Sequence, residues 1–204
     1  MDFNDTVLAE LVAKIRVLAE AIERRVAEKR AEFHYSVEKN RIRFEKGIEA
    51  GHRLLRRGLW QQISQSPIAF ILTAPIIYSL ILPLALLDLF LAVYQATCFR
   101  VYGIPRVPRS DFIVIDRQHL AYLNALEKLN CIYCGYANGL IAFTREIASR
   151  TEEYWCPIKH SRPVAMPHSR YVYFVDFGDA EGFRQRREAL REQVRHGDQP
   201  PPKA

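Results

Sequence analysis

Four residues with the types and spacing of zinc ligands are the most chemically distinctive feature of this chain. Cys131 and Cys134 form a Cys-x2-Cys pair, and Cys156 and His160 follow after a spacer of about twenty residues. Zinc takes four sulfur or nitrogen ligands at tetrahedral angles, and a tight turn brings two such sulfurs to one point. The pattern predicts a closed structural metal site with Cys131, Cys134, Cys156 and His160 as ligands. Zinc is the expected metal and iron the alternative.

The same residues allow other interpretations. His168 is an alternative fourth ligand, and His119 is a more distant one. A redox-active Cys131–Cys134 pair is a further possibility, but the βαβ setting of thioredoxin-like proteins is missing. A catalytic zinc would need an open coordination position and a general base. Glutamates are available nearby, but no pattern places one at the metal, so the sequence predicts no catalytic residue.

The elements expected to position the ligands are two helices joined by a turn. Asp116 is a plausible N-cap for a helix that runs to about Asn130, and a second helix is expected over Ala137 to Tyr154. Gly135, directly after the second cysteine, suits a sharp turn between them. This arrangement would bring all four ligands to one end of a helical hairpin, in a zinc-binding domain over residues 116–180. Short strands are expected at 171–175 and, less clearly, at 112–115.

Residues 64–101 form the membrane candidate. From Pro67 to Phe99 the only charge is Asp88. A straight helix of this length would be roughly 50 Å long, against a hydrocarbon core near 30 Å. Pro75 and Pro83 predict a break. Three arrangements fit: a kinked single span followed by an interfacial helix, a re-entrant hairpin that bends near Pro83, and two short spans.

Charge favours the hairpin, with both soluble parts in the cytoplasm. The formal net charge is +6, and arginines flank the apolar segment on both sides almost equally, at 53, 56 and 57 and at 100, 106, 109 and 117. The positive-inside rule needs an asymmetry to place the two ends on opposite sides. A thiol-rich metal site also prefers a reducing compartment. The basic flanks predict contacts with a lipid bilayer; nucleic-acid binding is not expected, because no recognition motif accompanies the charge.

The first 63 residues predict an amphipathic helical arm. Proline is missing from about Asp5 to Ile63, and apolar residues recur at spacings of three and four in a coiled-coil seam: Leu8, Leu11, Ile15, Leu18, Ile22 and Val26. The seam predicts either packing on the rest of the chain, or self-association and docking of a protein partner. Three later glycines, at 47, 51 and 58, favour a break in this stretch.

The remaining segments carry less information. A linker is expected at 102–115, a charged helix at 181–195 and a disordered tail at 196–204. With 204 residues the chain has room for one ordinary domain and its appendages. The acidic start, without a short apolar core after it, does not predict a signal peptide. The fold class is therefore mainly α, with a membrane segment and a small metal-stabilised helical domain.

The stretch from about Asp111 to Ser161 resembles uncharacterised bacterial membrane proteins. The resemblance rests on Cys131-Ile132-Tyr133-Cys134-Gly135-Tyr136-Ala137-Asn138-Gly139 and on Trp155-Cys156-Pro157-Ile158-Lys159-His160. It implies a bacterial setting and no activity. With the membrane segment, this setting predicts the inner membrane, with the soluble parts facing the cytoplasm.

Together these features favour a membrane-anchored, zinc-stabilised scaffold or adaptor that recruits partners at the membrane surface. The alternative is a metal- or thiol-handling redox protein that serves a membrane complex. A small membrane enzyme acting on a lipid or quinone is the third hypothesis. The sequence leaves open whether the protein is an enzyme.

Overall fold

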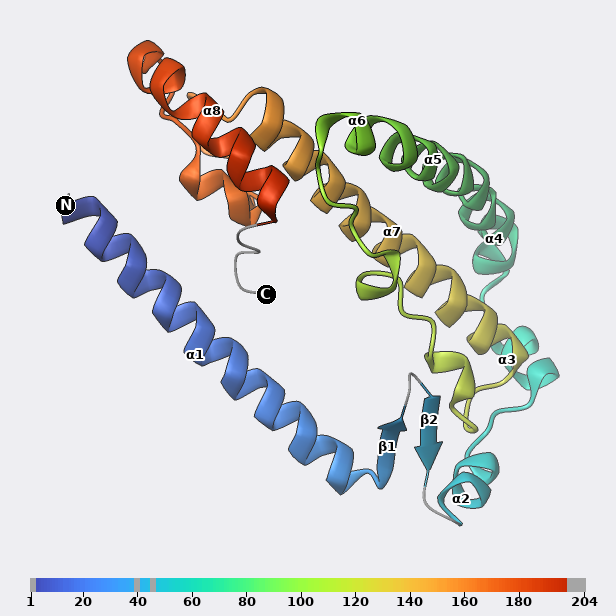
Figure 1. Cartoon of the computed structure of the whole chain (residues 1–204). Helices are drawn as coiled ribbons and strands as arrows, with labels where there is room; N and C mark the ends of the chain where they lie inside the picture. The colour runs from blue at the N-terminus through green and yellow to red at the C-terminus, as the bar shows by residue number, and fades with distance from the viewer. Residues whose placement is uncertain (1–2, 39–40, 45–46, 198–204) are drawn as a thin grey trace. The chain divides into compact units, whose positions relative to one another are not determined.

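The computed structural model describes residues 3–38, 41–44 and 47–197 and is mainly helical, as the sequence predicted (Figure 1). The chain folds as two compact units. Of the described residues, the first contains those up to Arg57 together with 119–124, and the second contains 58–118 and 125–197. The expected disordered tail lies, from residue 198, outside the described residues.

The first unit begins with helix α1, Phe3–Glu32, which is shorter than the sequence suggested. The prediction of helix almost throughout to Ile63 was wrong, because an antiparallel hairpin follows: β1, Tyr35–Glu38, pairs with β2, Arg41–Phe44. Tyr35 lies opposite Phe44 in this register, with their ring centroids 5.9 Å apart. Aromatic and β-branched residues in alternation favour a strand pair over a helix.

Helix α2, Ile48–Leu54, completes the first unit. His52 links two parts of it, because its ring lies 5.5 Å from Phe44 and 5.4 Å from Tyr122, both edge to face. These contacts attach residues 119–124 to the region around α2, although some seventy residues of sequence separate them.

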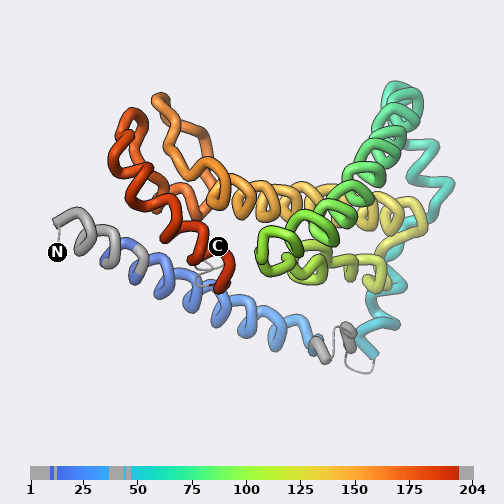
Figure 2. The backbone as a smooth tube through the Cα atoms, turned by 45° about the horizontal axis from the view of Figure 1, so that its top comes forward, coloured from blue at the N-terminus to red at the C-terminus, as the bar shows by residue number. Residues whose placement is uncertain are grey.

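The second unit opens with α3, Leu59–Gln65, followed by α4, Ile68–Ser79, and α5, Ile81–Tyr94. A π-helical turn, Gln95–Phe99, and α6, Arg100–Tyr102, continue the same path. Gly103 then ends the helix in the left-handed conformation, at φ 72°. The segment from Ile68 to Tyr102 is thus one helix of 35 residues, visible as a continuous green coil in Figure 2.

The predicted reversal near Pro83 was therefore wrong. Leu80 stays in the right-handed helical conformation between α4 and α5, so the helix direction is kept. Pro83 falls in the first turn of α5, where a missing backbone N–H removes no bond within that helix. Proline is tolerated at such a position, and for this reason it does not mark a bend here.

An irregular segment then leads from Gly103 back toward the start of α7, Ala125–Trp155. It contains two 3₁₀ turns, Arg109–Asp111 and Arg117–His119, and residues 112–115 are irregular. Helix α7 has 31 residues and runs through the positions where the sequence analysis expected a turn between two helices.

The C-terminal part contains a 3₁₀ turn, Ser169–Tyr173, and α8, Ala180–His196. The strand expected at 171–175 was wrong: only Val175 pairs, in an isolated parallel bridge with Ile158. The charged helix predicted at 181–195 is α8. Asp179 caps its start by accepting the backbone N–H of Gly182 at 2.8 Å, and Gly197 ends it at φ 67°.

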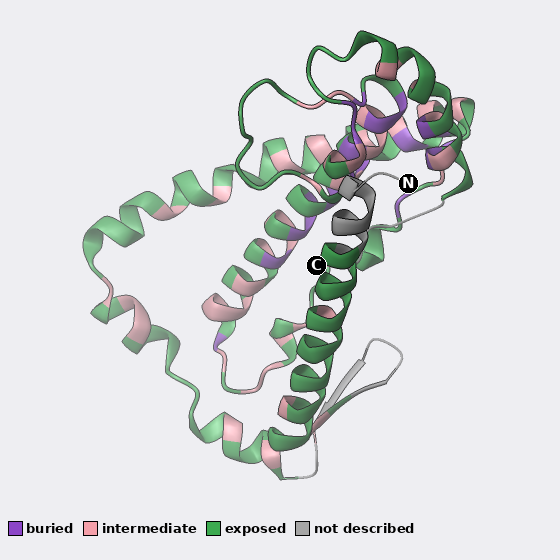
Figure 3. Cartoon of the chain, turned by 90° about the vertical axis from the view of Figure 1, so that its left-hand side faces the viewer, coloured by how far each residue is buried: buried purple, intermediate pink, exposed green. Residues whose placement is uncertain are grey.

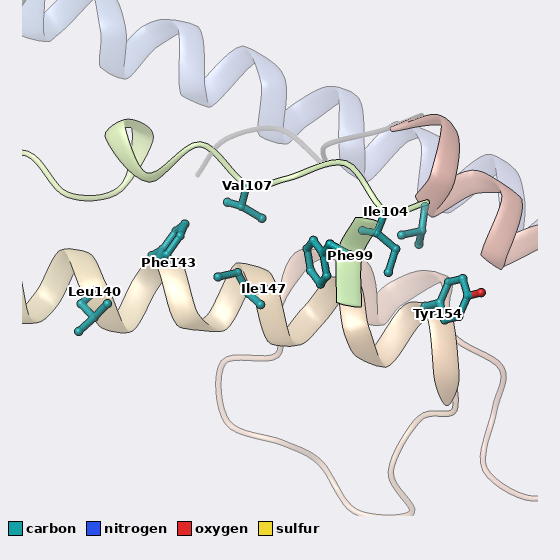
Figure 4. Packing of buried hydrophobic residues seen from close by; sticks show 8 residues of the cluster. Phe99, Ile104, Val107, Leu140, Phe143, Ile147 and Tyr154 are labelled. Carbon is teal, nitrogen blue, oxygen red and sulfur yellow. The ribbon is translucent and has the colours of Figure 1, made fainter. Parts of the chain in front are cut away.

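The core of the second unit lies between α7, the π-helical turn and the segment after α6. Its buried members are Phe99, Ile104, Val107, Leu140, Phe143, Ile147, Tyr154 and Val194. Figure 4 shows Leu140, Phe143 and Ile147 along one side of α7, with Val107 and Phe99 above them. Figure 3 shows that burial concentrates in this region. The second unit is therefore organised along α7.

Candidate functional site

The structure does not bring the four predicted metal ligands together. Cys131 and Cys134 lie near the start of α7, and Cys156 is the first residue after its end. Cys156 follows Cys131 by 25 positions, and residues 132–155 between them are all helical, which gives a distance of about 37 Å at 1.5 Å per residue. Among the described residues, no group of three or more His, Cys, Asp and Glu side chains is placed to hold a metal ion. These residues do not fit one tetrahedral site in this fold, and zinc stays a prediction from the sequence pattern.

Gly135 suggested a turn, and the structure assigns it a different role. Gly135 and Gly139 lie inside α7, on the side where residues 112–117 approach the helix. A Cβ at Gly139 would meet the carbonyl oxygen of Phe112 at 2.7 Å, and a Cβ at Gly135 would meet that of Val114 at 3.3 Å. The two glycines therefore allow backbone to lie directly on the helix surface. This close approach, rather than a turn, explains the Gly-x3-Gly spacing.

The histidines considered as ligands have other contacts. His160 donates its backbone N–H to the hydroxyl of Tyr171 at 2.6 Å, and its ring stacks on Tyr171. His168 Nε2 lies 2.9 Å from Glu152 Oε2, near the end of α7. His119 belongs to the 3₁₀ turn that precedes α7. Glu152, Glu153 and Cys156 lie at the same end of α7 as His168.

Cys156 is an exposed free thiol. Partial burial of its sulfur raises the pKa of the thiol, and the nearby Glu152 carboxylate raises it further. The thiolate is the nucleophile and the metal ligand, so a raised pKa makes Cys156 less reactive at neutral pH. The arrangement does not activate this cysteine.

A buried ion network lies at the same end of α7. Arg170 donates to Glu153 at 2.7 Å and to Glu146 at 3.1 Å, and Arg150 donates to Glu146 at 2.7 Å. Glu153 is 1 % exposed. Burial raises the pKa of its carboxyl, against the lowering effect of Arg170. The network attaches the 3₁₀ turn at 169–173 to α7, so its role is positional.

Asp88, the only charge of the apolar segment, is paired. Its carboxylate accepts Arg109 Nη2 at 2.6 Å and Nε at 3.3 Å, and the hydroxyl of Tyr136 at 3.0 Å. The sequence identified Asp88 but not its partners. Arg109 and Tyr136 come from the segment after α6 and from α7, and their approach depends on the tertiary fold.

The other polar side chains of the apolar helix are satisfied as well. Thr73, Ser79 and Thr97 each donate to a carbonyl oxygen in the preceding turn of the helix. Three more reach out of the helix: Tyr78 bonds Asn130, Tyr94 bonds Thr151 at 3.0 Å, and Gln95 accepts the N–H of Val107 at 2.8 Å. A helix in contact with lipid requires this, because hydrocarbon offers no partner to a free polar group.

Apolar side chains cover the rest of the helix surface. Leu72, Leu82 and Phe90 are 71 %, 68 % and 69 % exposed. Among the described residues, this is the one helix long and apolar enough to cross a membrane, with a mean hydropathy of 2.4 in its best window and none of that window buried. Length and composition alone carry this finding. An apolar helix of a soluble core would be covered by protein, whereas this one is exposed.

Comparison with protein-family models, with curated proteins and with solved structures found no match for the chain. The site therefore has to be interpreted from its own geometry. The helix from α4 to α6, apolar outside and internally satisfied, is the candidate functional surface.

Proposed function

We propose that the protein is a membrane-anchored scaffold or adaptor, in which the α4–α5 helix binds lipid and the α1 arm binds a protein. One observation carries the anchoring: the helix exposes large apolar side chains, while the Asp88 carboxylate and the hydroxyls of α4 and α5 have hydrogen-bond partners. A contiguous exposed apolar surface along a whole helix is typical of an interaction site.

The α1 arm supports the recruiting half of the proposal. Leu11, Ile15, Leu18, Ile22 and Val26, all on its seam, are 42 % to 63 % exposed. Isoleucine at 15 and 22 with leucine at 11 and 18 gives the alternation that favours two-stranded coiled coils. A second copy of the chain, or a partner helix of the same pattern, would cover this seam. The side chain of Leu8 lies outside those described.

The bacterial inner membrane, with the soluble parts on the cytoplasmic side, is the setting we propose. The basic flanks of the apolar segment and the free cysteines support it. A metal- or thiol-handling role receives less support, because the predicted ligands lie apart and Cys156 is not activated. A lipid- or quinone-directed enzyme would need a catalytic group that the sequence did not identify.

Flotation with phospholipid vesicles tests the anchoring. We expect the purified chain to float with vesicles. A variant with Leu72, Leu82 and Phe90 all changed to Glu should bind roughly tenfold more weakly or worse, because charged side chains are costly in lipid. A tenfold loss corresponds to about 1.4 kcal/mol. Leu54→Glu is the control, because Leu54 is at least as exposed but lies in α2. Equal flotation of the triple variant and the control would refute the proposed anchor.

A further inference from the structure

Helix α7 accompanies the apolar helix along most of its length. In order along the helix, the contacts are Tyr78 with Asn130, Asp88 with Tyr136, Tyr94 with Thr151 and Tyr102 with Tyr154. Both helices run in the same direction, because residue numbers rise together along the pairs. Any tilt of the apolar helix into a bilayer therefore carries α7 and the segment after α6 with it.

A single span from Ile68 to Leu87 conflicts with these contacts. Its midpoint lies near Tyr78, which bonds Asn130. Glu127 and Lys128 precede Asn130 within one turn of α7, so a span in this register would bring both charges close to the bilayer centre. Charged side chains at that depth are costly.

A span shifted toward the C-terminus meets a different obstacle. Centred on Asp88, it would place Arg109 and Asp111 at the level of the midplane, because Arg109 bonds Asp88 directly. Arg109 covers much of the Asp88 carboxylate, but Arg109 itself and Asp111 are both exposed. Exposed charges at that depth are expensive, whichever end of the helix faces the cytoplasm.

We propose that the helix from α4 to α6 lies along the membrane plane, inserted into one leaflet, with α7 and residues 103–118 on the water side. This inference rests on the proposed membrane anchoring. An in-plane helix has no length limit, whereas the 35 residues found here would extend about 52 Å upright, against a core near 30 Å. Interfacial helices bury their apolar face about 5–10 Å deep.

The partner is a leaflet that contains anionic phospholipid. Arg100 and Arg106, at the α6 end of the helix, are exposed beside the apolar surface. Trp60, in α3 at the other end, is exposed as well, and tryptophan prefers the headgroup level. Phosphate groups beside the arginines and acyl chains under the helix would complement this surface.

Depth measurement by single tryptophans tests the orientation. In a background with Trp60→Phe and Trp155→Phe, the three variants Leu72→Trp, Leu82→Trp and Phe90→Trp would be bound to anionic vesicles containing lipids brominated at defined carbons. Residues 72 and 90 are about 27 Å apart along the helix axis. We expect all three tryptophans to be quenched best by the same shallow bromine position. A depth difference of about 10 Å or more between any two would overturn the in-plane arrangement.

Proteolysis of the unmodified protein gives a second readout, in case a variant does not fold. Trypsin added outside preformed vesicles should cleave both before the helix, at Arg57, and after it, at Arg106 or in α8. Protection of one flank would overturn the proposal. If the chain does not float with vesicles, the anchoring itself fails; if it floats but the depths differ, only the orientation fails. Equal flotation with neutral and anionic vesicles would contradict the proposed contact of Arg100 and Arg106 with anionic headgroups.

Discussion

Gly139 permits the contact on which the second unit depends, because residues 112 and 113 lie against its Cα. In Gly139→Ala, the new Cβ would lie 2.7 Å from Phe112 O and 2.9 Å from Ile113 Cα, so backbone has to move. We expect a loss of about 1–3 kcal/mol in the free energy of unfolding, as for other overpacked sites, measured by denaturant titration in detergent. Gly51→Ala is the control, since among the described atoms none lies within 4 Å of a Cβ there. An equal effect of both variants would contradict the close approach.

Asp88 and Arg109 depend on each other. Removing Arg109 leaves a carboxylate beside apolar surface, and removing Asp88 leaves Tyr136 without its acceptor. We therefore expect Asp88→Ala with Arg109→Ala to cost less than the two single changes added together, with a coupling of roughly 0.5–3 kcal/mol. Thermal unfolding of the four proteins in detergent measures it. As a control, the stability losses of Arg106→Ala, on the same segment, and Asp88→Ala should add without coupling. If the losses of Arg109→Ala and Asp88→Ala also add strictly, the ion pair does not contribute to stability.

Glu153 makes stability depend on pH. Burial raises the pKa of its carboxyl above the ordinary 4.5, so the folded chain holds this proton more tightly than the unfolded chain. A group of this kind contributes most below pH about 4.5, and its contribution falls as pH rises toward the folded pKa. We expect the Tm of the wild type minus the Tm of Glu153→Gln to fall as pH rises through that window, because ionisation destabilises only the wild type. A wild-type Tm that instead rises relative to that of Glu153→Gln would mean that Arg170, not burial, dominates.

At the scale of elements, the sequence predicted some helices well and others poorly. The apolar helix, helix α1 and the charged helix α8 each follow from composition and periodicity within one segment. The sequence did not predict the hairpin β1–β2, because the pairing of Tyr35 with Phe44 joins two strands. It did not predict the unbroken α7 either, because Gly135 serves the close approach of another segment and not a turn. The bend predicted at Pro83 is missing, because proline does not disturb a helix when it lies in the first turn, and the sequence did not show that α5 starts at Ile81.

The α1 seam makes a prediction at this scale. Leu18→Glu with Ile22→Glu puts two charges on the seam, where coiled-coil cores require apolar residues. We expect the full-length protein in detergent to change from dimer to monomer by light scattering. Val17→Glu with Arg16→Glu is the matched control, because Val17 is equally exposed but lies off the seam. A monomeric wild type would exclude a second copy as the partner and leave a different protein in that role.

At the scale of the whole molecule, the metal pattern and the helix geometry make opposite predictions. Cys134 and Cys156 are exposed at opposite ends of α7, so we expect a maleimide to modify both in the native protein without a chelator. Cys131→Ser should then leave the fold intact by circular dichroism. If neither thiol reacts until a chelator is added, and the protein holds one zinc per chain, the continuous helix is contradicted and the four-ligand site is restored.

The sequence by itself determined which segments are apolar or charged and placed several of the helices, because hydrophobic periodicity and charge are local properties. It identified the long apolar helix and Asp88 in this way. Only the tertiary structure decided that α7 is continuous, that Cys131 and Cys156 lie toward its two ends, that Arg109 pairs with Asp88 and that Tyr136 donates a hydrogen bond to it. Such facts depend on contacts between residues far apart in the chain. The ligand pattern specified the right atoms for zinc, but a metal site also requires a backbone that brings its ligands to one point.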